Sequence, residues 1–194
     1  MSSKRPCARG QGGVTLIELI IFIVIVGVAV MAVLGVLSMT TKNSADPLRR
    51  KQALMIAEGL LEEVQLAKFT FCQPTAGNVD TAANAAACEN GLAENWGAEG
   101  TSRPHDNIND YVPAANKPTA AFDLNGQLSD ANGNPMPASG YAASVTITPQ
   151  VLGGIGAAGA NADTEVLRIR VTVSYGSEQV VLDGFRTRYA PNFP

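Results

Sequence analysis

The sequence predicts an α+β protein in which a long N-terminal helix is followed by a loop-rich middle and a C-terminal antiparallel sheet. Three observations carry this prediction. Residues 19–37 form an uncharged apolar run, residues 72–140 are rich in Ala, Asn, Gly, Pro and Asp, and the last third alternates apolar with polar residues. These patterns are typical of a helix, of loops and of half-buried strands, respectively. A chain of 194 residues suffices for one domain with appendages.

The apolar run predicts a membrane helix. Residues 19–37 read LIIFIVIVGVAVMAVLGVL, and residues 14–17 extend the run beyond the single acid Glu18. About 20 such residues cross the hydrocarbon core of a bilayer. The basic residues precede the run, so the positive-inside tendency keeps the N-terminus in the cytoplasm and sends the chain beyond residue 40 across the membrane. A cleaved secretory signal is the competing interpretation, but its apolar part is usually about 7–15 residues and ends in a small-residue cleavage motif.

The charge balance argues against binding of nucleic acid. The net charge is −3, and removal of residues 1–13 with their three basic side chains would bring it to −6. Neutralisation of phosphates requires clustered Lys and Arg, which an acidic chain of this kind does not supply. We therefore expect no nucleic-acid partner.

Glu18 stands near the start of the membrane helix. A carboxylate at the centre of a bilayer would cost roughly 2.5–3.5 kcal/mol, whereas the helix macrodipole favours negative charge at a helix N-terminus. An interfacial acid is therefore one interpretation of Glu18. The surrounding string GGVTLIEL, residues 12–19, gives another, because it resembles the class III signal of type IV pilins and pseudopilins, in which Gly and Phe precede TLIEL. Gly13 and residues 15–19 match this signal, and Val14 replaces the Phe.

The resemblance implies a processing route. A prepilin peptidase would cut between Gly13 and Val14 on the cytoplasmic face and methylate the new amine of Val14. The leader, residues 1–13, would be lost, and residues 14–38 would remain as a transmembrane and assembly helix. Glu18 would pair with the terminal amine of a neighbouring subunit, since a buried carboxylate is stable when a cation compensates its charge.

The same resemblance implies partners and a location. The partners are the prepilin peptidase, other major and minor pilins, the inner-membrane assembly platform and the membrane itself. The chain would lie in the bacterial inner membrane with its N-terminus in the cytoplasm and its head in the periplasm. It would later enter a pilus at the cell surface.

A second, amphipathic helix is expected over residues 39–70. The polar run 38–44 leaves the bilayer, and Asp46-Pro47 resembles an N-cap followed by proline in the first turn, so a helix should restart there. An apolar stripe at helical spacing predicts that this helix covers its own domain's sheet rather than a partner. The stripe consists of Leu54, Ala57, Leu61 and Val64.

Residues 71–194 are expected to form a globular head. Cys72 and Cys88 lie in its polar stretch. In a cytosolic protein they would be reduced thiols, but the export signal favours a disulfide. Such a bond would contribute about 3 kcal/mol to stability. Cys7 lies in the leader and is expected to have no structural role.

Three strands are predicted in the last third of the chain. The first contains Val145 and Ile147, the second spans residues 167–173, and the third spans residues 181–188. Gly176-Ser177 supplies the turn between the last two strands. The alternation predicts an antiparallel sheet with one apolar face and one face in water.

No enzyme active site and no metal site are expected. His105 is the only histidine, which is too few ligands for structural zinc. Residues 130–135 begin like a calcium loop, but Pro135 and Tyr141 stand where an EF-hand needs Gly and Glu. Calcium in this loop remains the one cofactor alternative, because related pseudopilins bind calcium in such loops. The chain also lacks a nucleophile elbow and a phosphate-binding glycine loop.

A second resemblance covers residues 45–191, which are similar to the D-type minor pilins of mannose-sensitive haemagglutinin pili. The motifs are residues 46–48, 69–72, 106–111 and 186–191. This resemblance implies a low-abundance subunit that initiates or caps a pilus and supports surface attachment. Many major pilins carry an early proline in the membrane helix, and none occurs between residues 14 and 46. The alternatives are a type II secretion pseudopilin and a membrane-anchored periplasmic protein that does not polymerise.

Overall fold

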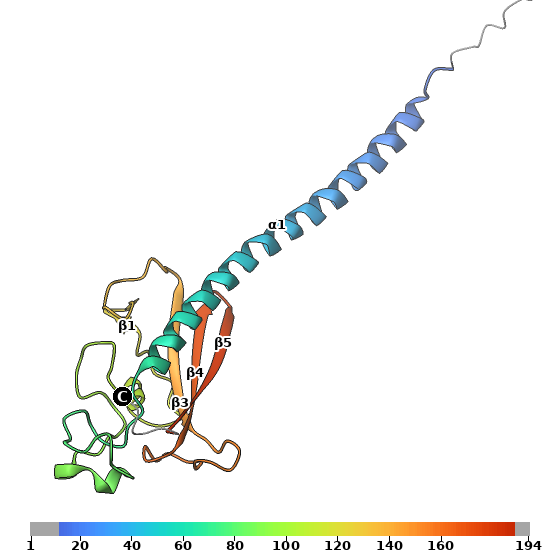
Figure 1. The fold of residues 1–194 in the computed structure, drawn as a ribbon. Helices are drawn as coiled ribbons and strands as arrows, with labels where there is room; N and C mark the ends of the chain where they lie inside the picture. Colours follow the sequence, from blue (N-terminus) through green and yellow to red (C-terminus); the bar gives the residue numbers. More distant parts are fainter. Residues whose placement is uncertain (1–11, 189–194) are drawn as a thin grey trace, which may run out of the picture. The chain divides into compact units, whose positions relative to one another are not determined.

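The computed structural model describes residues 12–188, and of residues 40–46 only the backbone (Figure 1). The chain divides between Pro47 and Leu48 into two compact units, which are described separately. The elements are α1 (Leu16–Leu66), the 3-10 helices η1 (Ala85–Ala87), η2 (Glu89–Gly91) and η3 (Ile108–Tyr111), and the strands β1 (Asp123–Leu124), β2 (Gln127–Leu128), β3 (Tyr141–Pro149), β4 (Val166–Tyr175) and β5 (Glu178–Thr187). The predicted α+β class is confirmed.

The helical backbone of α1 is continuous where a break and a restart were expected. Pro47 lies inside the helix. Residues 38–46 contain neither Gly nor Pro, so nothing there forces the backbone out of the helix, and a single proline removes one backbone hydrogen bond. The helix ends at Leu66, short of the expected boundary at residue 70, because the Lys68 N–H donates to the carbonyl of Asp106 at 3.0 Å.

The head unit contains the predicted antiparallel sheet, with the strands in the order β3-β4-β5. Val145 of β3 pairs with Val171 of β4, which pairs with Leu182 of β5. Alternate residues of β3 and β4 are buried, so the prediction of one apolar face is confirmed. The predicted turn is also present: Gly176 has a φ of +56°, a conformation that costs glycine little.

The part of α1 that belongs to the head, residues 48–66, packs on the apolar face of this sheet. Its buried positions are Ala53, Ala57, Leu60 and Val64. The expected stripe is therefore half wrong, since Leu54 is 37% exposed and Leu61 is only partly buried. Ala53 and Ala57 offer no long side chain to hold the helix backbone away from the strands, so the helix can lie close to the sheet at these two positions.

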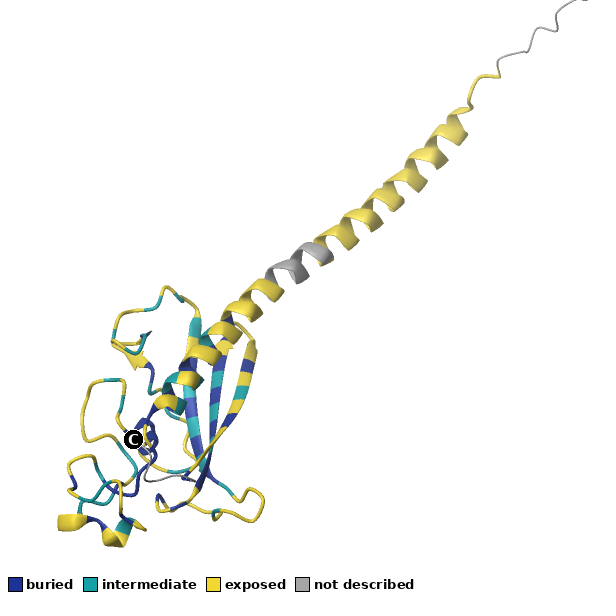
Figure 2. Ribbon diagram, viewed as in Figure 1, coloured by how far each residue is buried: buried dark blue, intermediate teal, exposed yellow. Residues whose placement is uncertain are grey.

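Residues 67–140 cross the head mostly as loops, as predicted for residues 72–140. They contribute three 3-10 turns and the two-residue strands β1 and β2, which pair with each other. Tyr111, Phe122 and Ile108 from this region are fully buried in the main core. Figure 2 shows that the buried residues gather in the sheet and in the loops beside it.

Candidate functional site

The predicted processing segment lies at the start of α1. Gly13 and Val14 precede the helix as exposed, non-helical backbone, and Val14 is 71% exposed. Thr15 is the residue before the first helical position, and its Oγ1 accepts a hydrogen bond from the Glu18 N–H at 3.4 Å. Glu18 lies exposed in the first turn of the helix.

Thr15 and Glu18 have the spacing of a capping box, a signal that the sequence analysis missed. In a capping box the side chain at the N-cap accepts from the backbone N–H three residues later, and a Glu or Gln at that later position reaches back. The hydrogen bond from Glu18 N–H to Thr15 is the first half of this arrangement. Glu18 therefore has a local structural role available in addition to pairing with an amine.

The apolar surface that follows is exposed throughout. The structure contains one helix segment, Leu16–Met39, that is long and apolar enough to cross a membrane, and none of its residues is buried within the described part of the chain. In Figure 2 this stretch of α1 is coloured as exposed. A contiguous apolar surface of this extent is typical of a site of contact with a membrane or with another protein.

The predicted disulfide joins Cys72 and Cys88, whose Cα atoms lie 5.5 Å apart. It forms the centre of a small second core that also includes Phe71, Ala76 and Ala82. The bond closes a polar segment with few apolar residues, so it replaces core packing as the constraint that holds this segment. The other cysteine, Cys7, lies outside the described residues.

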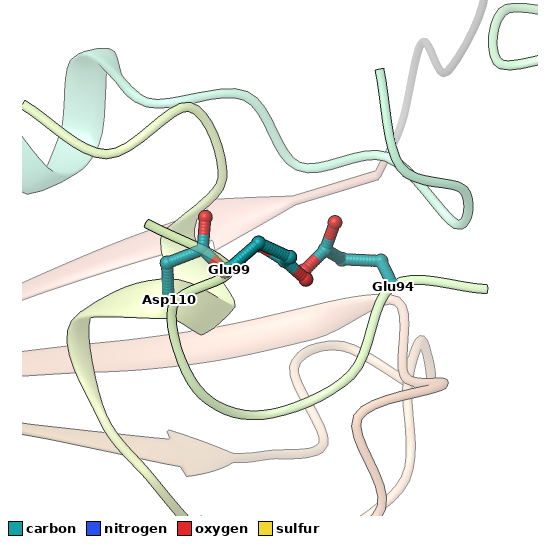
Figure 3. A group of neighbouring side chains, drawn as sticks. All are labelled: Glu94, Glu99 and Asp110. Atoms are coloured by element: carbon teal, nitrogen blue, oxygen red, sulfur yellow. The ribbon is translucent and has the colours of Figure 1, made fainter. Parts of the chain in front are cut away.

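Three carboxylates converge beside the disulfide, and we call Glu94, Glu99 and Asp110 the carboxylate cluster (Figure 3). One oxygen from each lies within 4.8 Å of the others. Figure 3 shows the side chain of Glu94 pointing toward Glu99, with Asp110 on the other side. In the sequence Asp110 stands within the motif 106–111, and no local pattern connects it with the two glutamates.

The backbone of residues 68–73 brings the cluster together. The Glu94 N–H donates to the carbonyl of Phe71 at 2.8 Å, and on the other side the Ile108 N–H donates to the carbonyl of Lys68 at 2.9 Å. The side chain of Gln73 donates to Glu99 Oε1 at 3.1 Å. One extended segment thus carries the two chain stretches that hold the acids.

A capping box positions Asp110 within η3. Asp110 Oδ2 accepts from the Asn107 N–H at 3.1 Å, and Asn107 Oδ1 accepts from the Asn109 N–H at 3.4 Å. The Asn107 amide also donates to the Thr70 hydroxyl at 3.1 Å. These bonds use one oxygen of Asp110 and leave Oδ1 facing no hydrogen-bond donor among the described residues.

Burial gives the cluster unusual electrostatics. Glu94 is 3% exposed and Asp110 is 5% exposed, whereas Glu99 is exposed to solvent. Burial raises the pKa of both the Glu94 and the Asp110 carboxyl groups, and the negative charge of Glu99 raises each pKa further, whereas a side-chain hydrogen bond with Asp110 lowers the pKa of Glu94. Burial and the nearby negative charge disfavour the ionised form, so the site attracts protons or cations.

The two sequence regions considered as metal sites, His105 and residues 130–135, make local contacts with neighbouring residues. The ring of His105 makes an edge contact with Tyr111, with 4.8 Å between ring centroids. Asp130 Oδ1 accepts from the N–H groups of Asn132 and Asn134 at 2.9 and 2.8 Å, as expected for a turn. These hydrogen bonds lower the pKa of the Asp130 carboxyl, and the bonds from Asn134 have the largest effect.

Comparisons of the chain with protein families, with curated proteins and with solved structures found no match. Its function is therefore inferred from its own residues and their geometry.

Proposed function

We propose that this chain is a type IV pilin-like subunit, anchored in the bacterial inner membrane by its N-terminal helix and assembled into a filament as a minor pilin. The observation that carries the proposal is the exposed apolar segment Leu16–Met39, which begins with the lone carboxylate Glu18 directly after Gly13-Val14. A membrane or the apolar helices of neighbouring subunits would cover this surface. We propose no enzymatic activity.

The position of the acid favours assembly over simple anchoring. An anchor helix gains nothing from a carboxylate beyond helix capping, and burial of that carboxylate in a filament core would need a compensating cation. The amine created by cleavage before Val14 would be such a cation, placed four residues before Glu18. The pairing proposed is between Glu18 of one subunit and the amine of another.

The head is compatible with export and with exposure on a pilus. Its disulfide suits the oxidising periplasm. A long helix whose residues 48–66 cover an antiparallel sheet is the arrangement that the pilin resemblance implies. We further propose that the subunit acts in a pilus of the mannose-sensitive haemagglutinin type and supports surface attachment, as the resemblance over residues 45–191 suggests.

The first experiment determines the N-terminus of the mature chain by mass spectrometry of the membrane fraction, with and without prepilin peptidase. The expected result is a methylated Val14 that is present only with the peptidase. Retention of residues 1–13, or a cut beyond the apolar segment, would overturn the proposal in favour of a plain anchor or a secreted head.

The second experiment separates the two roles of Glu18. The Glu18→Gln variant keeps a side chain that completes a capping box but loses the charge, whereas Glu18→Ala loses both. If the charge pairs with an amine, both variants fail to enter filaments. If Glu18 only caps the helix, Glu18→Gln assembles normally. Glu58→Gln, an exposed acid on the same helix, is the matched control and should assemble like the native chain.

The kind of filament is decided by deletion of the chain. Loss of surface filaments and of surface attachment supports a pilus. Retained pili with a defect in protein secretion would assign the subunit to a type II secretion filament instead.

A further inference from the structure

Two acids of the head are buried without a neutralising partner. Glu94 is 3% exposed and Asp110 is 5% exposed. Within the described residues, neither oxygen of Glu94 meets a hydrogen-bond donor, and neither does Oδ1 of Asp110, unless one of the two acids is protonated and shares its proton with the other. A buried carboxylate that is neither paired nor bound to a metal costs several kcal/mol. The two groups therefore require a proton or a cation.

The buried arginine of this region, Arg188, is engaged elsewhere. Its Nε donates to the carbonyl of Thr164 at 2.7 Å, and its Nη2 donates to the carbonyl of Ala162 at 3.2 Å. Its guanidinium lies 3.8 Å from the centre of the Phe69 ring. Among the described residues the ion pairs are Arg103–Glu63 and Arg170–Asp183, and neither involves Glu94. The Nη1 of Arg188 has no hydrogen-bond partner among these residues and the charge of Arg188 lowers the pKa of Glu94, but the two side chains form no ion pair.

The third acid gives the buried pair access to solvent. Glu99 is exposed, and one of its oxygens lies within 4.8 Å of oxygens of Glu94 and Asp110. Figure 3 shows the Glu94 side chain directed toward Glu99. The cluster thus combines two buried, unsatisfied carboxylates with one exposed carboxylate through which an ion can enter.

We propose that Glu94, Glu99 and Asp110 bind one divalent cation of the hard, oxygen-preferring class, and that this ion is calcium. Calcium binds oxygens at about 2.3–2.6 Å, so two oxygens on one ion can lie up to about 5 Å apart, which accommodates the cluster. The site is distinct from the 130–135 loop. It goes beyond the proposed function, because it depends on the head alone and holds whether or not the chain polymerises.

Calcium fits these donors better than zinc or magnesium. Zinc prefers Cys and His ligands, and here Cys72 is in the disulfide while His105 packs on Tyr111. Magnesium requires a nearly octahedral shell at about 2.0–2.1 Å, a stricter geometry than three carboxylates from separate loop segments readily supply. Calcium accepts irregular arrangements, and waters on the side of Glu99 can supply its remaining ligands.

The bound ion would fasten two loops to each other. Glu94 belongs to the stretch that follows the disulfide loop, and Asp110 belongs to η3 in the main core. Without an ion, these segments are joined through residues 68–73 and by one direct hydrogen bond, from the Gly97 N–H to the carbonyl of Asn109 at 3.2 Å. With the ion, the side chains of Glu94 and Glu99 are tied to η3 as well, so calcium stabilises the loop-rich half of the head.

The test uses the full chain in detergent micelles, first stripped of ions with EGTA. Calcium is titrated to about 5 mM by calorimetry, above the roughly 10⁻⁴–10⁻³ M dissociation constants of weak extracellular sites. Magnesium is titrated in parallel. Terbium serves as a second probe, because Trp96, the single tryptophan of the chain, lies between Glu94 and Glu99 in sequence and can sensitise its luminescence. Saturable calcium binding and a higher melting temperature with calcium than with EGTA are expected.

Two variants assign the binding to the cluster. Glu99→Gln changes an exposed side chain and keeps the fold, and it should weaken calcium binding at least about tenfold. Glu94→Gln should abolish the binding and the terbium signal. Glu89→Gln, an exposed acid on the same loop and outside the cluster, is the matched control and should bind like the native chain.

Three outcomes would overturn the proposal. The first is no calcium binding to the native chain at about 5 mM. The second is binding that survives unchanged in both Glu99→Gln and Glu94→Gln. The third is binding of magnesium that is at least as tight as that of calcium, because the ion of the site would then be magnesium and not calcium. None of these outcomes affects the processing at Gly13-Val14, so the proposed function is tested separately.

Discussion

The two parts of the chain use the same apolar side chains in opposite ways. Ile21 in the apolar segment is 53% exposed, whereas Ile147 in β3 is fully buried. The head covers its apolar side chains with its own sheet, helix and loops. The segment Leu16–Met39 covers none, because a single helix has no second layer on which to bury its surface. The first part therefore depends on its surroundings for stability, and the second on its own packing.

We expect the largest effect from a side-chain truncation in the core of the head. Ile147→Ala should lower the free energy of unfolding of the head by about 2–5 kcal/mol, because it removes buried methyl groups and leaves a cavity. The measurement is urea unfolding in micelles followed by the fluorescence of Trp96. Ile21→Ala is the matched control and should leave this transition unchanged; equal effects of both variants would contradict independent units.

A charge in the apolar segment tests the other side of the comparison. Val26→Arg should oppose membrane insertion by about 2.5–3.5 kcal/mol and move much of the chain out of the carbonate-resistant membrane fraction. Val181→Arg makes the same change on the exposed side of β5, where Val181 is 41% exposed, and should not alter the fraction. Full membrane retention of the Val26→Arg chain would argue against a bilayer-spanning helix.

Removal of the disulfide tests how the head compensates for its loop-rich half. The double variant Cys72→Ser, Cys88→Ser should lose about 3 kcal/mol of stability in urea unfolding, because the open loop gains entropy in the unfolded state. Calcium binding should weaken as well, since the segment of Glu94 follows the opened loop. Cys7→Ser should match the native chain in both measurements, and a native-like double variant would show that packing alone holds this segment.

The smallest expected effect lies at the first turn of α1. Thr15→Ala removes the side-chain acceptor of the Glu18 N–H and should destabilise the turn by about 1 kcal/mol. Amide hydrogen exchange of Glu18 in micelles should then be faster by about fivefold. Ser38→Ala, at the other end of the apolar segment, should leave the Glu18 amide unchanged. Unchanged exchange in Thr15→Ala would mean that the surroundings, rather than the cap, protect this amide.

The sheet could be predicted because its signal is local. Alternation along 141–149 and 166–175 needs only the period of a strand, and Gly176-Ser177 marks the turn without reference to distant residues. The helix on the sheet was predicted less well. Leu54 has a larger apolar side chain than Ala53, yet Ala53 is the buried residue, and of the adjacent Leu60 and Leu61 only Leu60 is fully buried. Burial there depends on the distance between helix and sheet, which periodicity does not contain.

The carboxylate cluster could not be predicted, because its members are weak signals when read singly. Glu94 and Glu99 stand in a polar stretch in which acids are usually solvated, and Asp110 completes a capping box. They meet because residues 68–73 bond to residues 92–94 on one side and to residues 106–108 on the other, and because the Gly97 N–H donates to the carbonyl of Asn109. That pairing joins parts of the chain that share no sequence pattern.

The sequence by itself determined the class of the protein: an uncharged run long enough to span a membrane, a strand-rich C-terminal third and a pair of cysteines placed to close a loop. Each of these follows from composition and short-range periodicity, which act before any tertiary contact forms. The tertiary structure decided which face of α1 covers the sheet, and it decided that Glu94 and Asp110 are buried together. Burial and the pairing of distant acids depend on how the chain closes on itself, so only the packed structure contains them.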